Sequence, residues 1–262
     1  MSSPLPSSTA VSGSGIAWFH YAAPQTFYGL AGRLWPWVAG LATLLGLVGL
    51  WIGFFVAPTD FQQGEGYRII FVHVPVSWMS MIIYLAMAFW SILLLVFNTR
   101  LSGMMTRALA PTGALMAFLS LWTGALWGKP MWGTWWVWDA RLTSELILFF
   151  LYLGYIALTS AIEDTRRADR AGALLAIVGA LNVPIIYFSV KWWNTLHQGA
   201  SVSLTKAPSM AQLMLWGMLC MAIAFWLYSI ALALYRVRTL ILQREAHTAW
   251  VQELPEVQGA RA

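Results

Sequence analysis

Residues 76–97 read VSWMSMIIYLAMAFWSILLLVF, a run of apolar and small polar side chains without a single charge. About 20 helical residues cross the roughly 30 Å hydrocarbon core of a bilayer, so this run is long enough to span a membrane. Five further apolar runs have a comparable length, at residues 34–58, 108–127, 142–162, 172–190 and 208–235. We therefore expect an all-α polytopic membrane protein, a bundle of six transmembrane helices that forms one domain over residues 1–262.

The composition agrees with a bilayer as the solvent. Hydrophobic residues make up 60% of the chain and charged residues 10%, whereas soluble domains carry about 25% charged residues. The single cysteine, Cys220, excludes an intrachain disulfide and CxxC thiol chemistry, and without a CxxCH sequence the chain is not a c-type cytochrome. A small buried hydrophobic role is typical of such a cysteine.

The two ends of the chain differ from its apolar runs. Residues 1–33 lack a basic start followed by an apolar core and a small-residue cleavage site, so we expect no removable signal peptide. We expect this segment to lie at the inner membrane surface, since it is aromatic and mixed in polarity. The polar residues 236–262 are predicted to form a cytoplasmic tail.

The basic residues predict how the helices are oriented. Of the 15 lysines and arginines, ten lie in the termini and in the segments 98–107 and 163–171, and five lie in the segments 59–75, 128–141 and 191–207. Lysine and arginine near helix ends are retained on the cytoplasmic side. Both termini are therefore predicted to be cytoplasmic, and the segments with five basic residues are predicted to lie outside.

The segment with the most unusual composition is the predicted outer loop WGTWWVWDAR at 132–141. Six of the 17 tryptophans lie between positions 122 and 138. A belt of interfacial tryptophans is the alternative explanation, but belt residues are spread around a bundle, whereas these are clustered in one short loop. Flat aromatic faces beside flexible glycines favour a site for a large planar ligand.

Two histidines share the predicted outer face with this loop. His73 lies at the start of the second helix and His197 in the third outer loop, whereas His20 and His247 belong to the inner side. A haem requires an aromatic platform, axial nitrogens and donors for its propionates. We therefore expect His73 and His197 to bind the iron. The platform and the groups around it are expected to be Trp132, Gly133, Trp135, Trp136 and Trp138, with Asp139 at the edge and Arg141 or Arg68 at a propionate.

Two acidic residues have structural alternatives. Asp139 has the position of a helix N-cap, with Arg141 as a possible ion partner. Glu145 is the one acidic residue that enters a predicted helix deeply, where a hydrogen bond to another helix or a proton-handling role would explain it.

These residues resemble those of the heme exporter protein C family, the C subunit of the cytochrome c maturation system. The resemblance rests on RIIFVHVPVSWMS at 68–80, WGTWWVWDARLTSELI at 132–147 and WWNTLHQGAS at 192–201, and six helices extend it over nearly the whole chain. It implies that non-covalent haem b, with His73 and His197 as axial ligands, is taken at the periplasmic face of the bacterial inner membrane. The haem is then presented to a membrane-anchored haem chaperone, which becomes covalently attached to it.

The same resemblance implies a complex with an ABC-type ATPase, a second polytopic subunit and a small single-span subunit. The chain itself has no phosphate-binding loop: residues 124–129 have the wrong glycine spacing, and proline follows the lysine. We therefore expect a haem-binding and delivery subunit rather than an enzyme. If it assists bond formation on the chaperone, it would do so by holding the haem in position.

Three other functions remain open. A b-type electron-transfer subunit normally holds its haem between histidines within facing helices, which the predicted spans do not offer. A permease normally has broken helices around a midplane site, for which Asn182 and Pro184 are the only indication. A scaffold of the complex would leave the two histidines unexplained.

Overall fold

The computed structural model describes residues 17–193, 195–197, 202 and 207–259, and within these ranges the chain is helical without a β-strand. Six helical segments are long and apolar enough to cross a membrane, which confirms the all-α polytopic fold. They are Pro24–Val56, Glu65–Phe97, Arg100–Trp132, Ala140–Ala161, Thr165–Trp192 and Gln212–Arg244.

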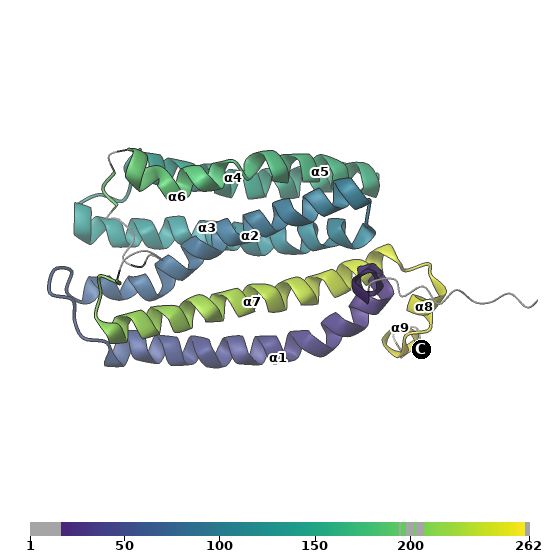
Figure 1. Cartoon of the computed structure of the whole chain (residues 1–262), viewed down its shortest axis with the longest axis horizontal. Helices are drawn as coiled ribbons and strands as arrows, with labels where there is room; N and C mark the ends of the chain where they lie inside the picture. The colour runs from purple at the N-terminus through teal and green to yellow at the C-terminus, as the bar shows by residue number, and fades with distance from the viewer. Residues whose placement is uncertain (1–16, 194, 198–201, 203–206, 260–262) are drawn as a thin grey trace, which may run out of the picture.

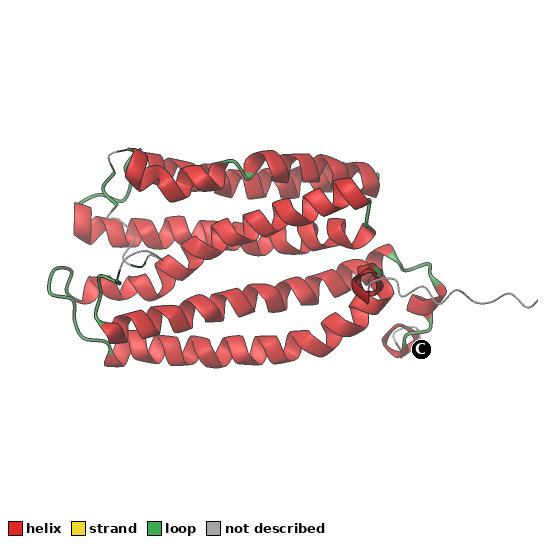
Figure 2. Ribbon diagram, viewed as in Figure 1, coloured by secondary structure: helices red, strands yellow, loops and turns green. Residues whose placement is uncertain are grey.

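The helices run antiparallel to their neighbours in sequence, along one common direction (Figures 1 and 2). The first and last spans, α1 (Pro24–Trp51) and α7 (Gln212–Arg244), pack along each other over most of their length. The remaining spans pack against this pair, and both α2 (Ile70–Phe97) and α3 (Arg100–Trp132) contact α7. They are completed by α4 (Ala140–Ala161), α5 (Thr165–Gly179) and α6 (Asn182–Trp192), which lie on the side of α2 and α3 away from α1 (Figure 1).

The bundle has two distinct ends. Because the number of spans is even, the chain finishes at the end where it began. The turn at residues 133–139 lies at the end where α1 finishes and α7 begins, and we call this the tryptophan end (Figure 1). The short connections at residues 98–99 and 162–164 lie at the opposite end, together with the start of α1 and the end of α7. We call this the arginine end.

Several helices are longer than the sequence predicts. The first begins at Pro24, ten residues before position 34, so only the 3₁₀ helix Ala17–Ala22 precedes it within the described residues. Proline is compatible with the first turn of a helix, where its missing N–H has no partner to lose. The second span begins with a 3₁₀ turn, Glu65–Ile69, and the last continues to Arg244. The polar tail then forms two short helices, α8 (Ala249–Gln252) and α9 (Pro255–Gly259).

The fifth span is broken between α5 and α6. Residues Ala180 and Leu181 separate the two helices just before Pro184, which lacks an N–H for a regular helical hydrogen bond. The Asn182 amide at this break donates to the Ser144 carbonyl oxygen of α4, 2.8 Å away. The polar group that accompanies the break is therefore satisfied by a neighbouring helix.

The core between α2, α3, α4 and α5 depends on close contact between aromatic and small residues. Tyr84 and Tyr152 are fully buried and meet edge to face, with ring centroids 4.9 Å apart. The Tyr152 ring also lies against Gly113 of α3, where an added Cβ atom would overlap the ring carbon Cε1. Small residues allow membrane helices to approach in this way, because lipid supplies no hydrophobic force between them.

We expect Gly113→Ala to destabilise the bundle by about 1–3 kcal/mol, since the added methyl group forces Tyr152 out of a packed position. Gly40→Ala in α1 is the control, because nothing lies within 4 Å of the added atom. Replacing glycine in a helix should there be neutral or stabilising by up to about 1 kcal/mol. Thermal unfolding in detergent measures both variants, and equal stability of the two would contradict the packing argument.

Candidate functional site

The tryptophan turn is fixed in place at both ends by local chemistry. At its start, Gly133 ends α3 with a left-handed backbone (φ 76°), and its N–H donates to the Lys129 carbonyl oxygen at 3.1 Å. Glycine adopts this conformation without the steric cost that a Cβ atom brings. At its end, Asp139 caps α4 by accepting a hydrogen bond from the Leu142 N–H at 2.8 Å. The expected N-cap role of Asp139 is thus confirmed.

The second oxygen of the Asp139 carboxylate faces His197, on the connection between α6 and α7. Its Oδ2 atom lies 3.4 Å from His197 Nδ1, and the two side chains are 10% and 18% exposed. Thr195 supports the same corner, because its hydroxyl oxygen accepts a hydrogen bond from the His197 backbone N–H at 2.9 Å. One carboxylate therefore connects the start of α4 to the imidazole.

Electrostatics decides which protons this pair carries. Burial lowers the pKa of His197 below its ordinary value, although the charge of Asp139 opposes that shift. Burial acts to raise the pKa of Asp139, but hydrogen bonds from Thr195 and Leu142 and the neighbouring His197 bring it below its ordinary value. At neutral pH Asp139 is ionised and His197 is neutral. With its proton on Nδ1, the neutral His197 ring faces two oxygens, the Thr195 hydroxyl at 3.3 Å and the Asp139 carboxylate at 3.4 Å, and its Nε2 lone pair stays available.

His73 is held by α3 in an equivalent way. Its Nδ1 lies 2.9 Å from the Thr123 hydroxyl oxygen, and that hydroxyl donates its own proton to the Leu119 carbonyl oxygen at 2.6 Å. Because a threonine has one hydroxyl proton, His73 must be the donor to Thr123. The Nε2 atom of His73 is therefore the nitrogen that carries a free lone pair.

The last turns of α3 contact both imidazoles. The His73 ring meets Trp127 edge to face at 5.5 Å between centroids, and it lies so close to Gly124 that a Cβ atom there would be 3.1 Å from the ring. The His197 ring meets Trp132 at 4.9 Å between centroids. Trp127 and Trp132 are about 7 Å apart along the helix axis. The two histidines also lie within electrostatic range of each other.

The indoles of the turn form an aromatic surface next to these rings. Trp136 and Trp138 meet edge to face with centroids 5.3 Å apart, as expected if the extended chain puts both on one side. Trp135 and Trp138 are 55% and 75% exposed. The Trp136 Nε1–H is buried and has no hydrogen-bond partner among the described residues. Unpaired buried donors are rare, so a ligand oxygen would satisfy this one.

The two candidate arginines lie in different surroundings. Arg141 donates to the Ile186 carbonyl oxygen of α6 at 2.9 Å, and its guanidinium is within electrostatic range of Asp139 and Glu145. It therefore does not form the close ion pair with Asp139 that its spacing suggested. Arg68 bonds Glu65 and the carbonyl oxygens of Gly53 (2.5 Å) and Ala57 (3.2 Å) at the end of the first span.

Glu145 extends the polar side of the site into the bundle. It is 4% exposed, and it accepts a hydrogen bond of 2.8 Å from the Ser80 hydroxyl of α2. The expected hydrogen bond to another helix is confirmed. The Ser77 hydroxyl, one helical turn beyond His73, lies 2.6 Å from that of Ser120. Polar side chains of α2, α3 and α4 thus form a contiguous group beneath the histidines.

The donor set fits a haem better than a bare metal ion. Among the described residues, no three His, Cys, Asp or Glu side chains gather to hold an ion. A porphyrin already supplies four nitrogens, so it requires only axial ligands from the protein. The two free imidazole nitrogens, the indole surface and the unpaired Trp136 N–H match that requirement.

Sequence reasoning missed the residues that orient the histidines. One face of α3 carries Thr123, Gly124 and Trp127. The first two precede Trp127 by four and three positions, a spacing that could have indicated the shared face. Thr195 precedes His197 by two residues, a spacing at which a hydroxyl often bonds the following backbone N–H. Which histidine each element faces depends on helix packing alone.

Comparison with known proteins gives a consistent family relationship. A family model described as heme exporter protein C matches residues 17–252. The chain is 48% identical over 240 residues to the heme exporter protein C of Haemophilus influenzae, covering 91% of this chain and 98% of that protein. It is 47% identical over 234 residues to the protein of the same name from Escherichia coli strain K12, covering 89% and 94%. The counterpart from Paracoccus denitrificans is 41% identical over 227 residues, covering 86% and 94%.

We expect Asp139→Ala to lower the free energy of unfolding by about 1 kcal/mol, because α4 loses its N-cap. Asp139→Asn should remain close to the wild type, since asparagine caps a helix about as well as aspartate. Thermal unfolding in detergent compares the two variants. An asparagine variant as unstable as the alanine variant would show that the charge, and not the cap, stabilises this corner.

Proposed function

The chain belongs to the heme exporter protein C family, and from this premise we propose that it binds haem b as a cargo at the tryptophan end of its bundle and presents it to a haem chaperone. The family works in haem handling for cytochrome c maturation. The chain contributes a binding and delivery subunit rather than an enzyme. In this proposal His73 and His197 are the axial ligands of the iron.

The observation that carries the proposal is the shared arrangement of the two imidazoles. The Nδ1 atom of each ring faces an oxygen, the Thr123 hydroxyl 2.9 Å from His73 and the Asp139 carboxylate 3.4 Å from His197. Hydrogen bonds of this kind fix the tautomer and the ring orientation of metal-binding histidines and increase their basicity. In the proposal, the two rings at this end of the bundle each use Nε2 to bind one iron.

The surrounding residues supply the remaining contacts for a haem. Trp132 lies against His197, and Trp135, Trp136 and Trp138 offer aromatic area that is partly exposed. The Trp136 N–H is placed to donate to a propionate, and Gly133 keeps the turn free of a side chain at its tightest point. Arg141 is the better propionate candidate of the two, since it lies within electrostatic range of both histidines, whereas Arg68 is bonded to Glu65 and two backbone carbonyl oxygens.

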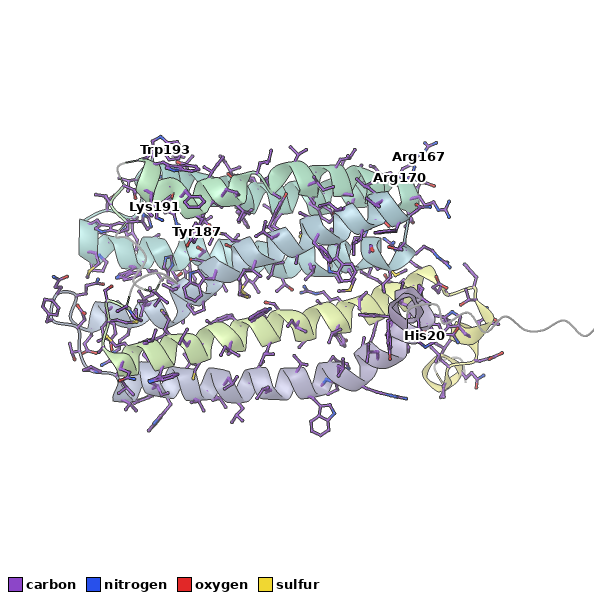
Figure 3. The ribbon with its side chains drawn as sticks, in the orientation of Figure 1. His20, Arg167, Arg170, Tyr187, Lys191 and Trp193 are labelled. Carbon is purple, nitrogen blue, oxygen red and sulfur yellow. The ribbon has the colours of Figure 1, made fainter. Side chains whose placement is uncertain are left out.

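Exposure at this end supports delivery rather than storage. Among the large side chains of the turn, that of Trp138 is the most exposed. Trp193, which is also exposed, lies near Lys191 at the end of α6 (Figure 3). A cargo held beside such a surface is accessible to a partner from the aqueous side. Iron ligation holds the porphyrin still, and positioning of this kind accelerates a reaction carried out by another protein.

The proposed location in the cell follows from the orientation of the six spans. With both termini on the cytoplasmic side, the tryptophan end faces the periplasm of a bacterial inner membrane. The proposed partners are the chaperone, an ABC-type ATPase, a second polytopic subunit and a small single-span subunit. Six apolar spans fill most of the described chain, so a nucleotide-driven step would come from the ATPase.

We expect the purified protein to carry haem with the low-spin optical spectrum of bis-histidine ligation. His73→Ala and His197→Ala should each lose that spectrum, because one axial nitrogen is removed. His20→Ala is the control, since His20 lies at the arginine end (Figure 3). Unchanged low-spin spectra in both site variants would exclude these residues as ligands.

We further expect Asp139→Asn to lower haem affinity by about tenfold or more, because the partner that orients His197 loses its charge while the helix cap is kept. Titration of the haem-free variant with haem measures this change. Asp164→Asn is the matched control, because Asp164 caps α5 at the opposite end through the Arg167 N–H. Equal losses in the two variants would point to general destabilisation instead of a role at His197.

A further inference from the structure

The arginine end contains a cavity that the proposed function does not use. The end of α2, the start of α3, the start of α5 and the end of α7 enclose about 470 Å³. Four arginines from three of these helices line it: Arg100, Arg166, Arg170 and Arg244. Figure 1 shows this end of the bundle opposite the tryptophan turn.

Two of the four arginines are already neutralised by buried carboxylates. Arg244 makes two hydrogen bonds to Asp169, at 2.7 and 2.9 Å, and Arg107 adds a third at 2.8 Å. Arg100 binds Glu245 at 2.7 Å. Asp169 and Glu245 are 7% and 6% exposed, so two of the four positive charges are balanced by buried carboxylates that also line the cavity.

The other two arginines have no such partner. Arg166 and Arg170 are exposed, and among the described residues neither side chain makes an ion pair or a hydrogen bond. They are four residues apart on α5, which puts them on the same face of the helix, where like charges repel. Arg166 also lies in the first turn of α5, where the helix dipole adds positive potential. An anion between them would relieve this repulsion.

The shape of the cavity indicates which kind of anion fits. Its lining includes the apolar side chains of Leu94 and Met104, and it lies at the ends of helices that are long and apolar enough to cross a membrane, where headgroups are expected. Val96 and Phe97, just before the lining residue Asn98, are 66% and 60% exposed. A ligand with a charged head and apolar chains would match both the arginines and the apolar side chains beside them. An acidic protein segment would use only the arginines.

We propose that this cavity binds the phosphate of one anionic phospholipid headgroup, with Arg166 and Arg170 as its principal partners. Guanidinium groups bind phosphate oxygens in pairs of parallel hydrogen bonds, and basic pockets between transmembrane helices are typical sites for anionic headgroups. A soluble phosphate ion shares this chemistry and is the other possible source. The proposal does not depend on haem binding at the opposite end.

The chain offers a matched control on the same helix. Arg167 is as exposed as its neighbours and carries the same charge, but it does not line the cavity. Figure 3 shows Arg167 and Arg170 at the same end of α5. Arg170→Gln and Arg167→Gln therefore change the net charge equally and differ only in their relation to the cavity.

Native mass spectrometry of the delipidated full chain tests the proposal with phosphatidylglycerol and phosphatidylcholine of identical acyl chains. We expect the wild type to prefer phosphatidylglycerol. Arg170→Gln should lower this preference by about fivefold and the Arg166→Gln, Arg170→Gln double variant by about 25-fold, while Arg167→Gln leaves it unchanged. Inorganic phosphate at the same concentration should not displace the lipid, because it lacks the acyl chains.

Four results would overturn the proposal. Equal losses in Arg170→Gln and Arg167→Gln would show diffuse surface attraction, and no preference in the wild type would exclude a headgroup site. Displacement of the lipid by inorganic phosphate at equal concentration would assign the cavity to a soluble ion. Unchanged lipid preference in the double variant would show that Arg166 and Arg170 do not bind the headgroup.

Discussion

The Asp139 carboxylate is the contact on which the arrangement of the tryptophan end depends. One of its oxygens caps α4 and thereby fixes where the tryptophan turn ends, and the other faces His197 on the connection between α6 and α7. The same side chain therefore sets the position of the indoles relative to the imidazole. A buried carboxylate is costly unless it is hydrogen-bonded, and here a backbone N–H and two side chains provide those bonds.

A comparable arrangement holds the other end together. Asp169 of α5 accepts hydrogen bonds from Arg107 of α3 and Arg244 of α7, so three helices converge on one buried carboxylate. Removing one partner from such a group leaves an uncompensated buried charge. The three helices must therefore keep these side chains in contact. The two ends of the bundle are thus each organised by one aspartate, with aromatic packing around Tyr84 and Tyr152 between them.

Much of the fold and part of the candidate site could be predicted from the sequence. The six spans follow from apolar length, because lipid leaves the backbone no alternative to a helix. Their boundaries were less accurate: α1 begins ten residues early, and the fifth span is broken before Pro184. The Asp139 cap was also predictable, since it depends on neighbours within three residues. The role of Thr123 was not, because it depends on which helix faces the His73 ring, whereas Thr195 bonds a backbone N–H only two residues away.

The sequence by itself determined the membrane class, the number of spans and the end of the bundle at which tryptophans and two histidines meet, since these follow from local composition and chain parity. Only the tertiary structure decided that His73 faces Thr123, that His197 faces Asp139, and that Arg141 bonds the α6 backbone instead of Asp139. It also decided that Arg166 and Arg170 face a cavity while Arg167 does not. The three hydrogen-bond contacts join residues between 45 and 58 positions apart, and the cavity lining depends on how α5 is rotated about its axis. The packing of the helices determines both.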